Sequence, residues 1–304
     1  MPKIAYNGWP NCYEISNGLI ELIATTDVGP RIIHCGFVGG ENIFRVYDEQ
    51  AGKTGGNEHR LYGGHRLWHA PEVAPRTYEP DNSAITLEEQ DDLEIRLIQP
   101  VEKTTGIQKE IDVQMDGRKA HVRLIHRLRN TNLWAVELAC WSISVMAQGG
   151  KAIIPLPPRG SQPENLLPVN TLTMWAYTNM ADPRWTWGNE YIMLQQDPNN
   201  DAPQKLGVMN AAGWAAYARN GNLFVKTFTH VAGATYPDWG CTTETFTWAS
   251  MLELETLGPL VQLRPNASIE HVEDWYLFKD VPTPANDADV NTHILPKMQS
   301  ILPY

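Results

Sequence analysis

The sequence predicts an all-β protein, built as one large antiparallel sandwich with few short helices. Asn-Gly or Asp-Gly pairs at 17–18, 116–117 and 220–221 separate segments of alternating apolar residues. Both central residues of a type I′ hairpin turn need a positive φ, which Asn, Asp and Gly adopt at low cost. Together with 22 prolines and 23 glycines, these pairs indicate many short strands joined by turns.

Segment 107–115 shows the two-residue period of a half-buried strand. Its odd positions are mostly apolar, and its even positions carry Gln, Glu, Asp and Gln. This alternation places one face on the core and the other in water. Segments 85–87 and 93–98 repeat the pattern just upstream, so we expect a meander of antiparallel strands.

Helical periodicity is scarce. Only Pro163–Leu167 and a C-terminal stretch around Asp289–Ile301 suggest helical turns, and Pro296 interrupts the second. No internal repeat or Ser/Gly-rich linker divides the chain. Large β-sandwiches often use about 300 residues for one domain, so we expect a single domain over residues 1–304.

Charge and composition exclude several classes of partner. The formal net charge is -11, with no concentrated basic patch, which argues against nucleic acid. No apolar run reaches the roughly 18 residues of a membrane span. The opening residues lack the pattern of a secretory signal, so we expect a cytoplasmic protein. Four widely spaced cysteines without a CxxC pair favour buried free thiols.

Glu253 and Glu255 alternate with two leucines in segment 251–259. A strand places them on one face, with Cα atoms roughly 6.5–7 Å apart. Like charges held close raise the pKa of at least one carboxyl group, which can then carry a proton near neutral pH. A polar strand face in water explains the same pattern, so the pattern alone leaves both interpretations open.

Segment 57–72 combines side chains that suit sugar recognition. Imidazole and guanidinium groups donate hydrogen bonds to hydroxyls, and an indole face stacks on the C–H face of a sugar. Three histidines and a glutamate would also suffice for a metal ion. Without a helix signal that would place the histidines on one face, we expect no metal, and a polar loop with structural histidines is the alternative. The candidates are His59, His65, Arg66, Trp68 and His69.

Further sugar-binding candidates lie later in the chain. Eleven tryptophans is a high count, and several fall in loop-like stretches, where aromatic side chains suit carbohydrate stacking. Lys226 and Arg66 are expected to bind a phosphate or a carboxylate, or else to be plain surface cations. The remaining candidates for substrate binding are Asp238, Trp239 and Glu244.

Several of these segments resemble the galactose mutarotase-like superfamily, which includes the aldose 1-epimerases. Asp27–Ile33 is similar to an early strand and turn of those enzymes, and Tyr62–Pro71 is similar to a loop that lines the sugar site in one branch. Met251–Glu255 is similar to the strand that carries the catalytic glutamate. The resemblance implies Glu253 as general base with Glu255 beside it, sugar contacts for His65, Arg66 and His69, and no cofactor.

One position departs from the family pattern. The family's general acid is a histidine on a central strand, but Val136–Ser144 contains none, and Trp141 stands in its place. An indole is not a useful proton donor. We therefore expect a histidine from another strand as the acid, with His65 preferred over His69 and His230.

Three functions follow as expectations. The first is an aldose 1-epimerase-like isomerase acting at the anomeric centre of a sugar. The second is a glycoside hydrolase or lyase acting on an oligosaccharide, since sandwich folds also carry those chemistries. The third is a carbohydrate-binding module without turnover, which the missing histidine favours.

Overall fold

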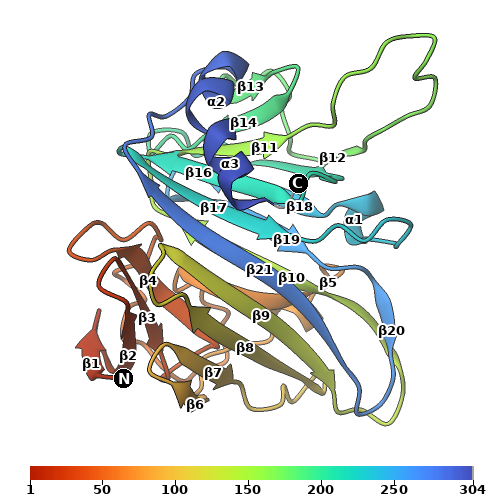
Figure 1. Ribbon diagram of the computed structural model, residues 1–304. Coiled ribbons are helices and arrows are strands. Elements are labelled where there is room, and N and C mark those ends of the chain that lie inside the picture. The colour runs from red at the N-terminus through yellow and green to blue at the C-terminus, as the bar shows by residue number, and fades with distance from the viewer. Residues whose placement is uncertain (303–304) are drawn as a thin grey trace.

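The computed structural model describes residues 1–302, which form two large antiparallel β-sheets packed face to face (Figure 1). This confirms the predicted all-β sandwich with few short helices. The first sheet is 11-stranded, and its strand β20 pairs only with β10. In order across this sheet the strands are β1 (Lys3–Tyr6), β2 (Trp9–Ser16), β3 (Ile20–Thr25), β4 (Arg31–Phe37), β5 (Gly64–Ala70), β10 (Val136–Met146), β19 (Met251–Leu257), β18 (Thr243–Trp248), β15 (Gln204–Val208) and β12 (Leu172–Met174), with β20 (Val261–Leu263) beside β10.

The second sheet is 10-stranded and contains the predicted meander at one edge. In order its strands are β13 (Trp185–Trp187), β14 (Tyr191–Gln195), β11 (Lys151–Pro155), β16 (Trp214–Arg219), β17 (Asn222–Phe228), β21 (Ser268–Lys279), β9 (His121–Asn130), β8 (Ile107–Met115), β7 (Glu94–Ile98) and β6 (Thr86–Asp91).

All three predicted hairpins are present, but only one has the expected turn. Asn220 and Gly221 both have positive φ values, of 48° and 76°, and join β16 to β17 as a two-residue loop. Asn17-Gly18 also joins paired strands, with a positive φ at Gly18 only. Neither Asp116 nor Gly117 has a positive φ. Instead, the loop is longer, and the Asp116 side chain accepts hydrogen bonds from the backbone N–H groups of residues 118 and 119. Side-chain hydrogen bonding thus replaces the expected backbone geometry.

The short helices lie outside the sandwich. The predicted C-terminal helical stretch forms two helices, α2 (Asp287–His293) and α3 (Leu295–Ile301). Pro296 lies in the first turn of the second helix, where its missing N–H is not needed. No helix forms at Pro163–Leu167. The remaining helical turns are η1 (Arg76–Tyr78) and α1 (Pro237–Gly240). Among residues 1–302, none of the helices is long and apolar enough to cross a membrane.

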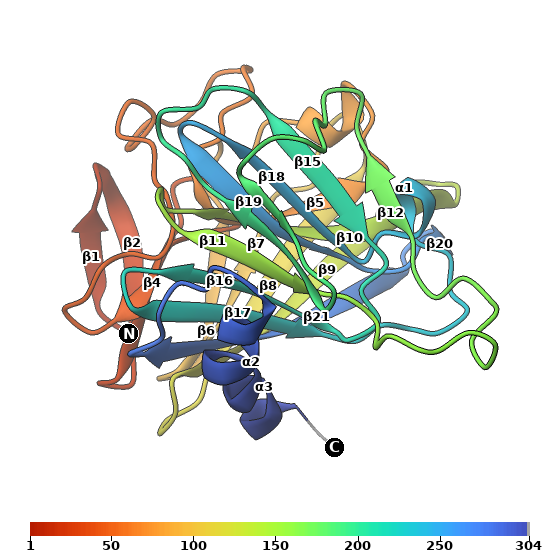
Figure 2. The ribbon, with the colours of Figure 1, turned by 90° about the horizontal axis from the view of Figure 1, so that it is seen from above.

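The main hydrophobic core lies between the sheets, and a second cluster lies under the C-terminal helices. Viewed from above, the first sheet, the second sheet and the α2–α3 pair follow one another as layers (Figure 2). Val290 of α2, Met298 of α3 and Ile294 between the two helices are fully buried in a cluster with residues of β11, β14, β16 and β17. The helices therefore cover this part of the second sheet's outer face.

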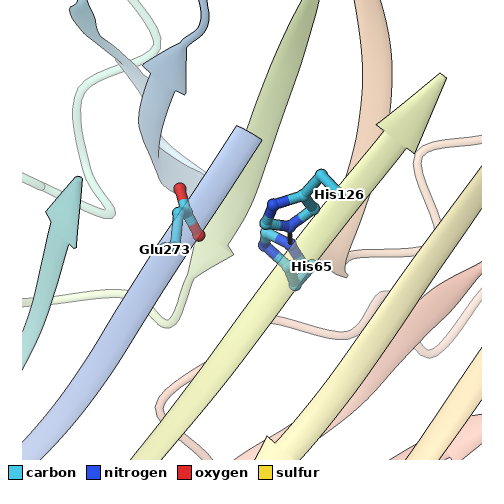
Figure 3. Close-up of side chains that lie close together, drawn as sticks. All are labelled: His65, His126 and Glu273. Carbon is cyan, nitrogen blue, oxygen red and sulfur yellow. Dashed lines mark hydrogen bonds between the residues drawn. The ribbon is translucent and has the colours of Figure 1, made fainter. Parts of the chain in front are cut away.

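A buried polar network joins the two sheets at their centre. His65 of β5 and His126 of β9 meet with their Nε2 atoms 2.7 Å apart, close to Glu273 of β21 (Figure 3). His126 Nδ1 donates to the backbone carbonyl of His271, so its Nε2 must be the acceptor, and the N–H belongs to His65. The Nδ1 atom of His65 then accepts from Ser144. This assignment holds for neutral rings, which burial favours because it lowers the pKa of both imidazoles.

Glu273 is the charged centre of this network. Its Oε1 atom accepts from Ser142, from Thr256 and, at 3.1 Å, from the ammonium group of Lys226. Burial alone would raise the pKa of Glu273, but Lys226 holds it well below its usual range. Buried charges persist in a core when they are paired and hydrogen-bonded, and this pair meets both conditions.

The histidines of this network make the fold sensitive to acid. Burial lowers the pKa of His65 well below its usual range and that of His271 to about 4. Between these values and about 6.5 the unfolded chain binds protons that the folded chain does not. We therefore expect each such histidine to lower the free energy of unfolding below pH 6.5, by about 1.4 kcal/mol per pH unit, whereas a carboxyl group whose pKa is raised in the fold acts in the opposite direction. Urea unfolding at pH 7.5, 6.0 and 5.0 measures this slope.

The substitution His271→Gln removes one titrating ring, and we expect it to reduce the slope between pH 6.5 and 5. His293 is exposed at the end of α2, so His293→Gln is the matched control and should leave the slope unchanged. A slope between pH 6.5 and 5.0 that is the same in His271→Gln as in the unmodified protein would contradict a neutral His271.

Candidate functional site

A pocket of about 330 Å³ opens on the outer face of the first sheet, over β5, β10, β18 and β19. Small-molecule sites commonly start near this volume. Successive side chains of a strand point to opposite faces, so Arg66 and Trp68 of β5 face the pocket while His65 and Leu67 face the second sheet. The pocket is therefore built from alternate residues of the central strands.

Glu253 lies at the base of the pocket and is 9% exposed. Its Oε1 atom accepts a hydrogen bond of 3.0 Å from the Arg66 guanidinium group. That guanidinium group also stacks over the Trp68 ring, 4.2 Å from its centroid. The ion pair and the ring contact hold the carboxylate at a fixed position with one edge toward the open space.

The pKa of Glu253 is raised to about 7. Burial is the largest cause, and the neighbouring charge of Glu255 adds to it, whereas Arg66 acts in the opposite direction. A carboxyl group with this pKa exchanges a proton readily near neutral pH, which an ordinary surface glutamate does not.

Glu255 projects from the same face of β19, as predicted, but it is fully buried. Its Oε2 atom accepts from the indole N–H of Trp141 at 2.8 Å and from Lys205 Nζ at 3.3 Å. The ammonium group of Lys205 lies 2.8 Å from Glu244 as well. It also lies over the Trp141 and Trp175 rings, at 4.8 and 4.6 Å from their centroids.

Two buried carboxyl groups share one ammonium group in this cluster. Burial alone would lower the pKa of Lys205, but Glu244 and Glu255 raise it well above its usual range, so Lys205 stays charged. Burial raises the pKa of Glu244 well above its usual range, and Glu255 adds to this, whereas Lys205 acts in the opposite direction. The cluster thus holds one ammonium group between two buried carboxyl groups beside the pocket.

The walls and mouth of the pocket are aromatic. The Trp68, Tyr78 and His59 rings form one cluster, with centroid separations between 5.3 and 5.5 Å. Burial and the nearby Arg66 lower the pKa of His59 to about 4, so this ring is neutral near pH 7. Such flat apolar surfaces suit a sugar ring. The other aromatic lining residues are Trp141, Tyr177, Phe246 and Trp248.

Three of the residues predicted for the site lie on the far side of the sheet. His65 belongs to the buried network between the sheets, and so does Lys226, which pairs with Glu273. His69 is buried too, with its Nε2 atom 3.3 Å from Glu102. Successive side chains of a strand point to opposite faces of the sheet. Because Arg66 and Trp68 face the pocket, the side chains next to them in β5 face the other way. The structure therefore does not bring His65 to Glu253, contrary to the predicted arrangement of acid and base.

Among residues 1–302, the buried network between the sheets holds the one group of His, Cys, Asp or Glu side chains whose possible ligand atoms lie close enough together to bind a metal ion. The ligand atoms of His65, His126 and Glu273 lie within 4.8 Å of one another. However, the two histidine Nε2 atoms bond to each other, and the Glu273 oxygens are occupied by hydrogen-bond donors and by Lys226. A dication would have to displace these partners beside an existing positive charge, so the residues do not fit a metal site.

Asp238 and Trp239 lie in α1, apart from the residues that line the pocket. Both have positive φ values, of 50° and 64°, and the Trp239 side chain is 84% exposed. Their backbone is anchored because Thr173 donates a hydrogen bond to the Asp238 carbonyl. The structure gives this exposed indole no partner within residues 1–302.

Sequence reasoning missed several lining residues. Lys205 and Tyr78 come from two separate segments, and no local pattern links them to Glu253. Lys205 reaches the site because β15 pairs with β18, which places it opposite Phe246. Trp141, noted in the sequence as standing at a histidine position, lines the pocket and binds Glu255.

Comparison with known proteins supports the architecture. No family model and no curated protein matches the chain at the level of sequence. Several solved structures match over most of its length. They include a candidate aldose 1-epimerase from Klebsiella pneumoniae, with a TM-score of 0.59, 12% identity, and coverage of 98% of this chain and 86% of that one.

A galactose mutarotase-like protein from Lactobacillus casei has a TM-score of 0.56 and 8% identity, with coverage of 88% of this chain and 100% of that one. A galactose mutarotase-related enzyme from Lactobacillus acidophilus has a TM-score of 0.51 and 10% identity, with coverage of 88% and 98%. At these identities the likeness concerns the fold alone. Residues 1–302 therefore adopt the galactose mutarotase-like fold.

Proposed function

We propose that the chain binds a saccharide in the pocket around Glu253 and catalyses the interconversion of its anomers. The observation that carries the proposal is the Glu253 carboxyl group, which has a pKa of about 7 at the base of an aromatic pocket. The aromatic walls supply stacking surfaces for the sugar ring. Solved structures of similar fold carry mutarotase or aldose 1-epimerase names, which agrees with this chemistry.

In the proposed reaction, ionised Glu253 takes the proton of the anomeric hydroxyl group. The bond between the anomeric carbon and the ring oxygen breaks, the exocyclic oxygen becomes a carbonyl, and the ring oxygen takes a proton from a water molecule at the pocket mouth. Rotation about one bond and the reverse steps close the ring on the other face. Arg66 holds Glu253 in place throughout.

A second candidate function is binding without turnover. The pKa of Glu253 is about 7, whereas the pKa values of Tyr78 and Tyr177 are about 12 and that of His59 is about 4. A pocket with one such group suits recognition as well as catalysis.

Replacing the proposed base tests the reaction directly. Glu253→Gln keeps a hydrogen-bond acceptor for Arg66 but cannot take a proton, so we expect the rate of anomer interconversion to fall at least about 100-fold. Polarimetry or saturation-transfer NMR on common aldoses measures the rate. Glu137→Gln, at an exposed position of β10, is the matched control and should keep full activity.

No acceleration by the unmodified protein on any aldose would exclude the isomerase reaction. Calorimetric binding of sugars by that inactive protein would then support the second candidate, and release of reducing ends from glycans would instead indicate bond cleavage.

The pH profile offers an independent check on Glu253. A base must be deprotonated to act, so we expect the rate to rise with pH and to reach half its maximum near pH 7. Arg66 lowers the pKa of Glu253, so removing its charge in Arg66→Gln should move the midpoint upward by about one to three pH units. A titration of the labelled Glu253 carboxyl carbon by NMR measures the same shift without turnover. A midpoint that stays in place, or moves down, would contradict the ion pair.

A further inference from the structure

The charged groups around the pocket form two sets. Paired charges lie at the bottom of the pocket and, among the residues that the structure describes, an unpaired carboxylate lies at its mouth. At the base, Arg66 is paired with Glu253, and Lys205 with Glu244 and Glu255. Both cations that line the pocket are therefore already bound to carboxyl groups. A phosphate or carboxylate on a ligand would meet no free cation there, and it would have to compete with a glutamate for each.

The mouth carries Glu72, an exposed carboxylate that accepts a hydrogen bond from the Tyr78 hydroxyl. Within residues 1–302 no Lys, Arg or His lies within salt-bridge distance of it. Its negative charge also contributes to the raised pKa of Glu253 and of Tyr177, so it acts across the pocket from them. Glu72 is thus the lining carboxylate that a positively charged ligand group can reach.

The rings beside Glu72 favour the same kind of ligand. Tyr78 makes edge contacts with Trp68 and His59, with centroids 5.3 Å away in each case. Aromatic faces attract an ammonium group and offer nothing comparable to an anion. The carboxylate and the rings therefore form one surface that suits a cation.

We infer that the pocket selects an amino sugar, whose ammonium group binds Glu72 and the neighbouring rings, and that it rejects sugars bearing phosphate or carboxylate. This inference rests on the proposed sugar-binding function and names the class of sugar. Lys226, a candidate from the sequence for binding an anionic group, is buried between the sheets and cannot contact a ligand in the pocket.

The test compares ligands that differ only at carbon 6: glucose, 6-amino-6-deoxyglucose, glucuronate and glucose 6-phosphate, with the same four in the galactose series. Calorimetry with the full chain near pH 7 gives each affinity. We expect the amino sugar to bind about fivefold more tightly than the neutral sugar, the factor that a partly exposed ion pair supplies, and the two anions to bind more weakly than the neutral sugar.

The variant Glu72→Gln should abolish the preference for the amino sugar, measured as the ratio of its affinity to that of the neutral sugar. Glu88→Gln, at an exposed position of the edge strand β6, is the matched control and should keep the preference. Urea unfolding confirms that both variants fold.

Tighter binding of glucuronate or glucose 6-phosphate than of the neutral sugar would overturn the inference and leave sugar binding intact. A preference for the amino sugar that survives in Glu72→Gln would overturn the role of Glu72. If none of the eight ligands binds, both the inference and the proposed function fail.

Discussion

The ion pair between Arg66 and Glu253 connects two strands that are far apart in the sequence and fixes the base of the pocket. It forms because β10 lies between β5 and β19, so that residues of all three strands share one outer face. The same alternation sends His65 to the opposite side, into the space between the sheets. One geometric rule therefore builds two polar sites back to back across the first sheet.

The buried carboxyl groups of these two sites have different partners, and their pKa values shift in opposite directions. Between the sheets, Glu273 has several donors and the buried Lys226, so its carboxylate is stabilised and its pKa is lowered. In the pocket, burial and the neighbouring Glu255 outweigh the single contact with Arg66, and the pKa of Glu253 rises. Structural carboxylates are saturated with partners, whereas a reactive carboxylate keeps one side free for a ligand. Glu253, which has one hydrogen-bonded partner in Arg66, fits the second description, as the proposed reaction requires.

The position of the pocket also follows from which faces are covered. The α2–α3 pair covers the part of the second sheet's outer face formed by β11, β14, β16 and β17, and the inner faces of the two sheets cover each other. The middle of the first sheet's outer face retains aromatic and charged side chains instead. Large apolar surface left open to water commonly marks a binding site.

The sequence by itself determined the all-β class, the three hairpin positions and the shared face of Glu253 and Glu255, because turn chemistry and the two-residue period are local properties. It also singled out Arg66, Trp68 and Trp141, which line the pocket. The tertiary structure alone decided that His65, His69 and Lys226 lie inside the sandwich and that Lys205 and Tyr78 lie at the pocket. The period of a strand says which residues share a face, but only the pairing and packing of strands distant in sequence say what that face meets.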